Sequence, residues 1–200
     1  MLNNAGAALP GPIEYVPLED LRRQLEVNTV GQVAVTQAFL PLVRRAGGRI
    51  VFVGSVGGRV ALPFIGPYAA SKSAISSIAD SLRQELAPWG IWVSVVEPGN
   101  VATPIWDKGE TGTSRAIESL PPEGRERYAK ALESGTDTAV KMGRKGADPD
   151  KVARVVEQAL TSNRPRARYL VGADAYAQVA LSRLLPDRLF GRLVARQMGL

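Results

Sequence analysis

The pattern of apolar and polar positions divides the chain into alternating helices and strands. Apolar residues recur at helical spacing over residues 18 to 45 and again over residues 67 to 88, where Pro67 suits a first helical turn. Two short, almost wholly apolar and β-branched runs, GGRIVFVGS (47 to 55) and IWVSVVEPG (91 to 99), are typical of strands buried on both faces. The order helix, strand, helix, strand predicts an α/β fold with a parallel sheet.

The second half of the chain has weaker patterns. Residues 100 to 125 are rich in Gly, Thr, Ser and Pro without a sustained period, which predicts a long mobile loop over a site, followed by a polar helix to about Lys141. A helix capped by Asp148 and a strand at residues 167 to 172 should follow. Two short helices separated by Pro186 should complete the chain.

Composition limits the available chemistry. Two hundred residues, 45% hydrophobic and 22% charged, suffice for a single domain over residues 1–200 without stabilising cross-links. The chain has no cysteine and no histidine, so thiolate and imidazole metal ligands, cysteine nucleophiles and histidine-dependent triads are excluded, and we expect no metal site. No apolar run approaches the roughly 20 residues of a membrane span. These features favour a cytoplasmic protein whose acids and bases are Tyr, Lys, Asp or Glu.

The net charge of +6 concentrates near the C-terminus. Residues 161 to 200 carry seven arginines and two aspartates, but no interleaved aromatic platform, so we expect no nucleic-acid binding. Within the predicted C-terminal helices (174 to 200), arginines recur every four residues beside leucines. Such a helix either packs on its own domain or a twin subunit, or makes peripheral contact with a membrane surface. The arginines are Arg188, Arg192 and Arg196.

The stretch YAASK (68 to 72) places a tyrosine and a lysine one helical turn apart. A free phenol has a pKa of about 10, and a nearby ammonium lowers that pKa. Taken alone, the pair is more often an ordinary core tyrosine beside a lysine. Ser55 and the segment EPGNVATP (97 to 104) each follow a predicted strand, however, so they should reach the same edge of the sheet.

Taken together, these segments resemble the short-chain dehydrogenase/reductase family. The resemblance is close over residues 1 to about 104 and loose beyond, and the stretch from Gly58 onward looks most like the retinol and hydroxysteroid dehydrogenase branch. It implies an incomplete Rossmann-like, doubly wound parallel sheet, the C-terminal part of that fold. The motifs in the family's order and spacing are NNAG (3 to 6), Asn28, Ser55, YAASK (68 to 72) and PGNVAT (98 to 103).

The resemblance also implies an activity, the interconversion of a secondary alcohol and a ketone, or of a retinol- or steroid-like hydrophobic alcohol and its carbonyl, with NAD or NADP. Tyr68 would be the general acid/base, Ser55 would hydrogen-bond the substrate oxygen, and Lys72 would lower the pKa of Tyr68 and hold the nicotinamide ribose. Asn28 would position a water linking Lys72 to solvent. The implied cofactor-binding residues are Asn3, Gly6, Tyr68, Lys72, Pro98, Gly99, Val101 and Thr103.

Further expectations follow from the same resemblance. Asn4 would brace the sheet, residues 104 to 145 would cap the substrate, and a homo-oligomer would form through the helices at 18 to 45 and 67 to 88. The family's opening TGxxxGxG turn, which holds the pyrophosphate, does not occur in this sequence, so we expect an N-terminally truncated form. Two alternatives stay open: a non-catalytic truncated homologue acting as a dimerisation partner, and an interfacial membrane binder.

Overall fold

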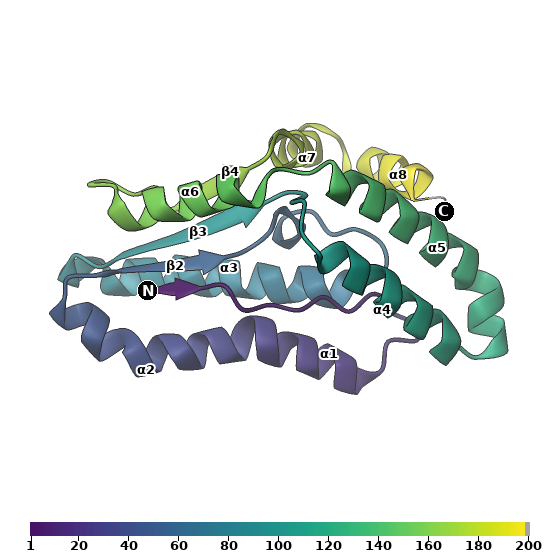
Figure 1. Cartoon of the computed structure of the whole chain (residues 1–200), viewed down its shortest axis with the longest axis horizontal. Helices are drawn as coiled ribbons and strands as arrows, with labels where there is room; N and C mark the ends of the chain where they lie inside the picture. The colour runs from purple at the N-terminus through teal and green to yellow at the C-terminus, as the bar shows by residue number, and fades with distance from the viewer. Residues whose placement is uncertain (199–200) are drawn as a thin grey trace.

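Four parallel strands form the centre of the computed structural model, which describes residues 1–198 (Figure 1). The strands lie in sequence order across the sheet, and each pairs in parallel with the next. The predicted α/β fold with a parallel sheet is therefore confirmed. The strands are β1 (Leu2–Asn3), β2 (Arg49–Val53), β3 (Trp92–Pro98) and β4 (Arg168–Val171).

Helices α1 (Leu18–Leu25), α2 (Gly31–Arg45) and α3 (Gly66–Leu86) lie on one side of the sheet (Figure 1). The helix predicted over residues 18 to 45 is observed with one change, since the π-helical turn η1 (Glu26–Val30) joins α1 to α2. The 3-10 turn η3 (Ala87–Trp89) follows α3. The core beneath these helices consists mainly of buried strand and α3 residues: Ile50, Phe52, Ile75, Ala79, Val93 and Val95.

Helix α6 (Pro149–Thr161) covers the other side of the sheet (Figure 1). Its predicted N-cap is confirmed, because the Asp148 side chain accepts a hydrogen bond from the Asp150 N–H at 2.9 Å. The alternate strand residues point to this side, so β2 and β3 are apolar on both faces, as a doubly covered parallel sheet requires. They pack with Ala159 of α6 in a second cluster: Val51, Val96, Tyr169 and Val171.

A helical hairpin, α4 (Ile105–Ser119) and α5 (Pro122–Arg144), follows β3. The prediction of a long mobile loop over residues 100 to 125 was therefore wrong. The helix α4 has poor intrinsic propensity but packs along α5, where the Trp106 ring occupies the space left by Gly143. The Thr113 and Thr136 hydroxyls join the two helices at 2.7 Å.

The chain continues with α7 (Ala173–Leu184) and α8 (Asp187–Gln197), and Pro186 separates them as predicted. Leu189 and Leu193 of α8 are 45% and 50% exposed, and the arginine stripe beside them is exposed as well. Peripheral membrane contact through this helix stays a prediction, as does a cytoplasmic location. Within residues 1–198, no helix is both long enough and apolar enough to cross a membrane.

The packing of α3 on the sheet generates a stability prediction. Ile75 is 0% exposed in the core between α3, β2 and β3. We expect Ile75→Ala to lower the free energy of unfolding by about 2 to 5 kcal/mol, because the smaller side chain leaves a cavity. Chemical denaturation measures this change. The control Leu184→Ala, at a residue that is 79% exposed, should stay within about 0.5 kcal/mol of wild type. Equal losses in both variants would contradict the described core.

Candidate active site

Ser55 lies in a tight turn at the carboxyl end of β2. It caps the 3-10 turn η2 (Val56–Gly58), and its Oγ accepts a hydrogen bond from the Gly57 N–H at 3.0 Å. A Cβ at Gly57 would lie 3.3 Å from Cε1 of Tyr68, and one at Gly58 would lie 2.8 Å from the carbonyl of Lys72. Two glycines thus allow the turn to press directly on α3, which brings Ser55 beside Tyr68.

Tyr68 is the third residue of α3 and is partly buried. Burial raises the pKa of its phenol above the usual 10.0, and a hydrogen bond with the Ser55 side chain partly offsets this rise. The expectation that Lys72 lowers this pKa stays a prediction, because the two causes of the shift are burial and the Ser55 hydrogen bond. The cost of placing a phenolate in a partly buried environment exceeds the opposing effect of Ser55.

Lys72 is 4% exposed and reaches from α3 toward the end of β2. Its Nζ donates a hydrogen bond to the carbonyl oxygen of Val53 at 2.8 Å and lies 6.0 Å from the centre of the Tyr68 ring. Burial lowers the pKa of the Lys72 ammonium from its usual 10.5 to about 8. The side chain is therefore mostly charged near neutrality, and its first contact is a backbone carbonyl.

Asn28 lies in the π-helical turn and is 0% exposed. Its amide makes two hydrogen bonds of 2.8 Å with the backbone of Ala7, and its Nδ2 also donates to Ser71 Oγ at 2.9 Å. A Cβ at Gly6 would lie 3.4 Å from Lys72 Nζ and 3.5 Å from Asn28 Oδ1. The missing side chain of Gly6 therefore keeps open the space beside the Lys72 ammonium.

The asparagine that braces the sheet is Asn3, which corrects our prediction for Asn4. Asn3 is 5% exposed, and its Nδ2 donates to Thr36 Oγ1 of α2 at 3.0 Å, whereas Asn4 is exposed. Asn3 is the last residue of β1, whereas Asn4 lies beyond the strand.

The segment that begins at Pro98, the last residue of β3, and runs to Thr103 lies next to the end of β2. Its shape depends on Asp174 of α7, whose carboxylate accepts from the Asn100 N–H at 2.7 Å and from Asn100 Nδ2 at 3.0 Å. The same carboxylate packs so closely on Gly99 that a Cβ there would overlap it. Trp106 Nε1 donates to the carbonyl oxygen of Val101 at 2.7 Å. Asp174 and Trp106 are supporting residues that the sequence motifs did not reveal.

The structure thus brings Ser55, Tyr68, Lys72, Asn28 and Gly6 together at the carboxyl edge of the sheet. The other predicted cofactor residues lie at the end of the neighbouring strand or directly after it, at the same edge. This crevice is where α/β sheets bind their ligands. The predicted cofactor-binding residues at the end of β3 and directly after it are Pro98, Gly99, Val101 and Thr103.

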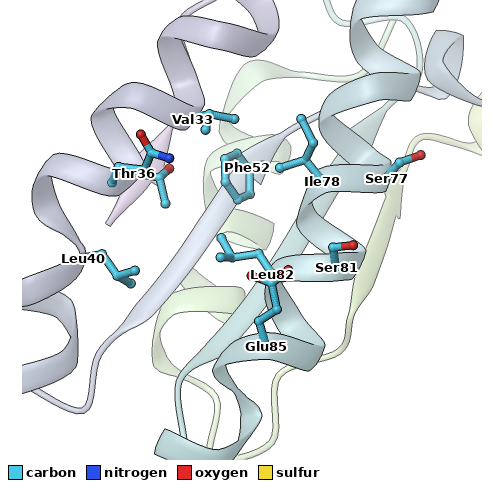
Figure 2. A pocket seen from close by; sticks show the side chains of 10 residues that line it. Val33, Thr36, Leu40, Phe52, Ser77, Ile78, Ser81, Leu82 and Glu85 are labelled. Atoms are coloured by element: carbon cyan, nitrogen blue, oxygen red, sulfur yellow. The ribbon is translucent and has the colours of Figure 1, made fainter.

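A separate groove of about 430 Å³ lies between α2 and α3, with Phe52 of β2 as its floor (Figure 2). Its α3 lining runs from Ser77 to Glu85, more than two helical turns beyond Tyr68. The groove is therefore not part of the Ser55 and Tyr68 cluster.

A doubly covered parallel α/β sheet with polar and ionisable side chains at its carboxyl edge is typical of nucleotide-binding proteins. Consistently, the family model described as short chain dehydrogenase matches residues 1–113. The chain belongs to the short-chain dehydrogenase/reductase family.

Three relatives illustrate the similarity. The "NADPH-dependent 3-dehydrocapnine reductase" of Ornithobacterium rhinotracheale is 33% identical over 203 residues, which cover 99% of this chain and 69% of the relative. "Retinol dehydrogenase 5" of Mus musculus is 38% identical over 198 residues, with 94% of this chain and 61% of the relative covered. A crystal structure of a short chain dehydrogenase from Burkholderia cenocepacia in complex with NADP has a TM-score of 0.65 at 25% identity, with 98% and 68% covered. The chain thus spans 61% to 69% of the length of these proteins.

The lowered pKa of Lys72 generates a pH prediction. The unfolded chain holds this proton up to about 10.5 and the folded protein releases it near 8, so the unfolded state binds more protons between these values and stability rises with pH across that window. Relative to Lys72→Met, the wild type should gain about 2 kcal/mol of unfolding free energy between about pH 7 and about pH 10. Denaturant titrations at the two pH values measure this gain.

Lys151→Met is the matched control, because it removes one lysine charge at an exposed position of α6. A difference between wild type and Lys72→Met that does not change with pH would show that the ammonium of Lys72 is not penalised by burial.

Proposed function

We propose that the protein is an NAD(P)-dependent oxidoreductase that interconverts a secondary alcohol and a ketone, with Tyr68 as the general acid/base. The observation that carries this proposal is the convergence of Ser55, Tyr68 and Lys72 through the glycine turn after β2. Family membership supports the reaction type, and the NADP complex of a relative supports the cofactor class.

The residues of this chain fit a nicotinamide cofactor at the carboxyl edge of the sheet. The open space at Gly6 adjoins the Lys72 ammonium, a donor suited to ribose hydroxyls, and the segment from Pro98 to Thr103 lies at the end of the next strand and directly after it. When bound, the cofactor supplies the hydride acceptor or donor. Asn28 contributes to this site by hydrogen-bonding the backbone of Ala7. These bonds hold the backbone that follows Gly6 in place.

The proton chemistry follows from the pKa directions. Because burial raises the pKa of Tyr68, its phenol keeps its proton near neutrality and is suited to donating it to a carbonyl oxygen. The Ser55 hydroxyl, which bonds to that phenol, is placed to hydrogen-bond the same substrate oxygen. We infer that reduction of a ketone is the direction favoured near neutral pH, and that oxidation of an alcohol, which requires the phenolate, improves as the pH rises.

Residues 104 to 145 are proposed to cap the substrate. In α5, the ring of Tyr128 packs edge-on against Phe64 with 6.3 Å between ring centroids, and Phe64 lies four residues before Tyr68. The Tyr128 hydroxyl also donates to Glu14 Oε2 at 2.7 Å. These contacts join the hairpin of α4 and α5 to the segment just before the N-terminus of α3. The aromatic contacts and the retinol dehydrogenase relative support a hydrophobic substrate.

Tyr68→Phe tests the proposed chemistry. Removal of the phenolic hydroxyl should lower turnover by about two to four powers of ten and change the affinity for NADH or NADPH far less, because proton transfer is the main function lost. Steady-state kinetics and fluorescence titration of the cofactor measure the two effects. Tyr176→Phe, at an exposed tyrosine of α7, is the matched control. Turnover near the wild-type value in Tyr68→Phe would refute Tyr68 as the acid/base.

A homo-oligomer through α2 and α3 is proposed as well. Val35, Phe39 and Leu42 form a stripe along α2 and are 47%, 50% and 51% exposed. These residues follow helical spacing, and the groove between α2 and α3 is a second, concave surface that borders the same helix (Figure 2). Apolar area of this kind marks an interaction surface, and a second copy of the same chain is the partner that we propose.

Phe39→Glu tests this interface. A carboxylate in an apolar contact between copies is desolvated without a partner, so the variant should sediment as a monomer at concentrations where the wild type associates. Analytical ultracentrifugation measures the difference. Leu184→Glu introduces the same charge at an exposed leucine of α7 and should sediment like wild type. A wild type that is monomeric at high micromolar concentration would rule out the proposal.

A further inference from the structure

A chain of charged side chains runs from the turn after Ser55 to the middle of α3. At its centre is Glu97 of β3, which is 0% exposed. Arg59, the residue directly after η2, donates through Nε to both carboxylate oxygens of Glu97 at 3.0 Å, and its Nη2 lies 2.8 Å from Oε2. The residues in this series of charged side chains are Arg59, Glu97, Arg168, Asp80 and Arg83.

The second half of this series of charged side chains reaches α3 through Arg168 of β4. Arg168 donates through Nη1 to Glu97 Oε1 at 2.7 Å, and its Nη2 pairs with Asp80 of α3. Asp80 also pairs with Arg83, one turn further along the same helix. The turn that carries Ser55 and the helix that carries Tyr68 are thus connected through one buried carboxylate.

A contribution to folding stability does not by itself explain why the Glu97 carboxylate is buried. Burying an ion costs several kcal/mol, and an apolar side chain of similar volume at such a site is often neutral or stabilising. An arginine that bonds side-on to both carboxylate oxygens does, however, fix a distance and an orientation. The end of β2 is also fitted to Glu97, since a Cβ at Gly54 would lie 3.4 Å from Glu97 Cγ and 2.9 Å from Val95 Cγ1.

The Arg59 pair adds a directional bond to the sheet to the contacts that this turn already makes with Tyr68 of α3 and with α7. Gly57 and Gly58 let the backbone of the turn approach α3 closely. The glycines themselves form no directional bond to the helix. Arg59 is the next residue, and its guanidinium ends on a carboxylate in the sheet. The Arg59 and Glu97 ion pair therefore fixes the position of the turn that the two glycines bring close to α3.

We propose that the Glu97 and Arg59 pair is a positioning device that holds the Ser55 turn at one place on α3, so that the Ser55 hydroxyl faces the Tyr68 phenol. Both are positioning residues, because they act through Ser55. The consequence for turnover rests on the proposed function, whereas the placement of the turn is measurable without cofactor or substrate.

Two matched variants separate positioning from general stability. Arg59→Met and Arg168→Met each remove one guanidinium from Glu97, but only Arg59 belongs to the Ser55 turn. Native-state amide exchange by NMR reports on the Gly57 N–H, which donates to Ser55 Oγ. We expect Arg59→Met to speed exchange at Gly57 by about 10-fold or more relative to β2 amides, and Arg168→Met to leave this ratio within about 3-fold.

A purely structural network predicts a different result. Loss of either arginine would then accelerate core amides of β2 and β3 together, with no selective effect at Gly57, and that outcome would overturn the proposal. If Arg59→Met does not fold, Arg59→Lys keeps the positive charge but loses the side-on geometry, so selective exchange at Gly57 is expected there too. Unchanged exchange at Gly57 in the lysine variant would equally overturn it.

Kinetics keep this inference separate from the proposed function. Arg59→Met should lower kcat by about 10-fold or more with little change in the KM for cofactor, because the nucleotide contacts are untouched. If Tyr68→Phe retains full turnover, the proposed chemistry fails, while the exchange result still decides the placement of the turn. If Tyr68→Phe is inactive but Arg59→Met has normal kcat and normal Gly57 exchange, the positioning inference fails alone.

Discussion

The close approach of the turn after β2 to α3 is the contact on which the rest of the site depends. Ser55 is supplied by the strand, while Tyr68 and Lys72 are supplied by the helix, so their alignment requires backbone to touch backbone. A Cβ at Gly58 would lie 2.8 Å from the Lys72 carbonyl, a distance at which the turn or the helix must move. The glycines here are required by packing distance and not by an unusual backbone angle.

Burial then sets the chemistry of the groups that this contact brings together. The same low exposure that raises the pKa of Tyr68 lowers the pKa of Lys72 to about 8, because each residue is held in its neutral form more readily than in water. The pKa values of the two groups are thereby further apart than those of free tyrosine and free lysine. Near neutrality the site therefore holds a protonated phenol together with a lysine that is still mostly charged.

The sequence predicted the framework well because the framework follows from periodicity. The strands at 49 to 53 and 92 to 98 and the helix at 66 to 86 fall where continuous apolar runs and helical spacing placed them. Helix α4 was missed because its stability comes from contact with α5, as the fit of Trp106 over Gly143 shows, and such a contact is not encoded in local composition. The effect of burial on the Tyr68 pKa cannot be predicted from the sequence for a similar reason, since burial arises from the assembled fold.

The supporting residues of the site illustrate the same limit more sharply. Asp174 shapes the backbone at Asn100 from 74 positions away, and Glu97 reads in the sequence as one polar residue that ends an apolar strand. Only the assembled structure shows that Glu97 is enclosed and that two arginines from different elements meet on it. A buried carboxylate is costly to keep, so its directional bonds to Arg59 explain its presence better than its contribution to stability does. The sequence motifs name the candidate reacting groups, whereas the buried ion pairs that connect their elements are visible only in the structure.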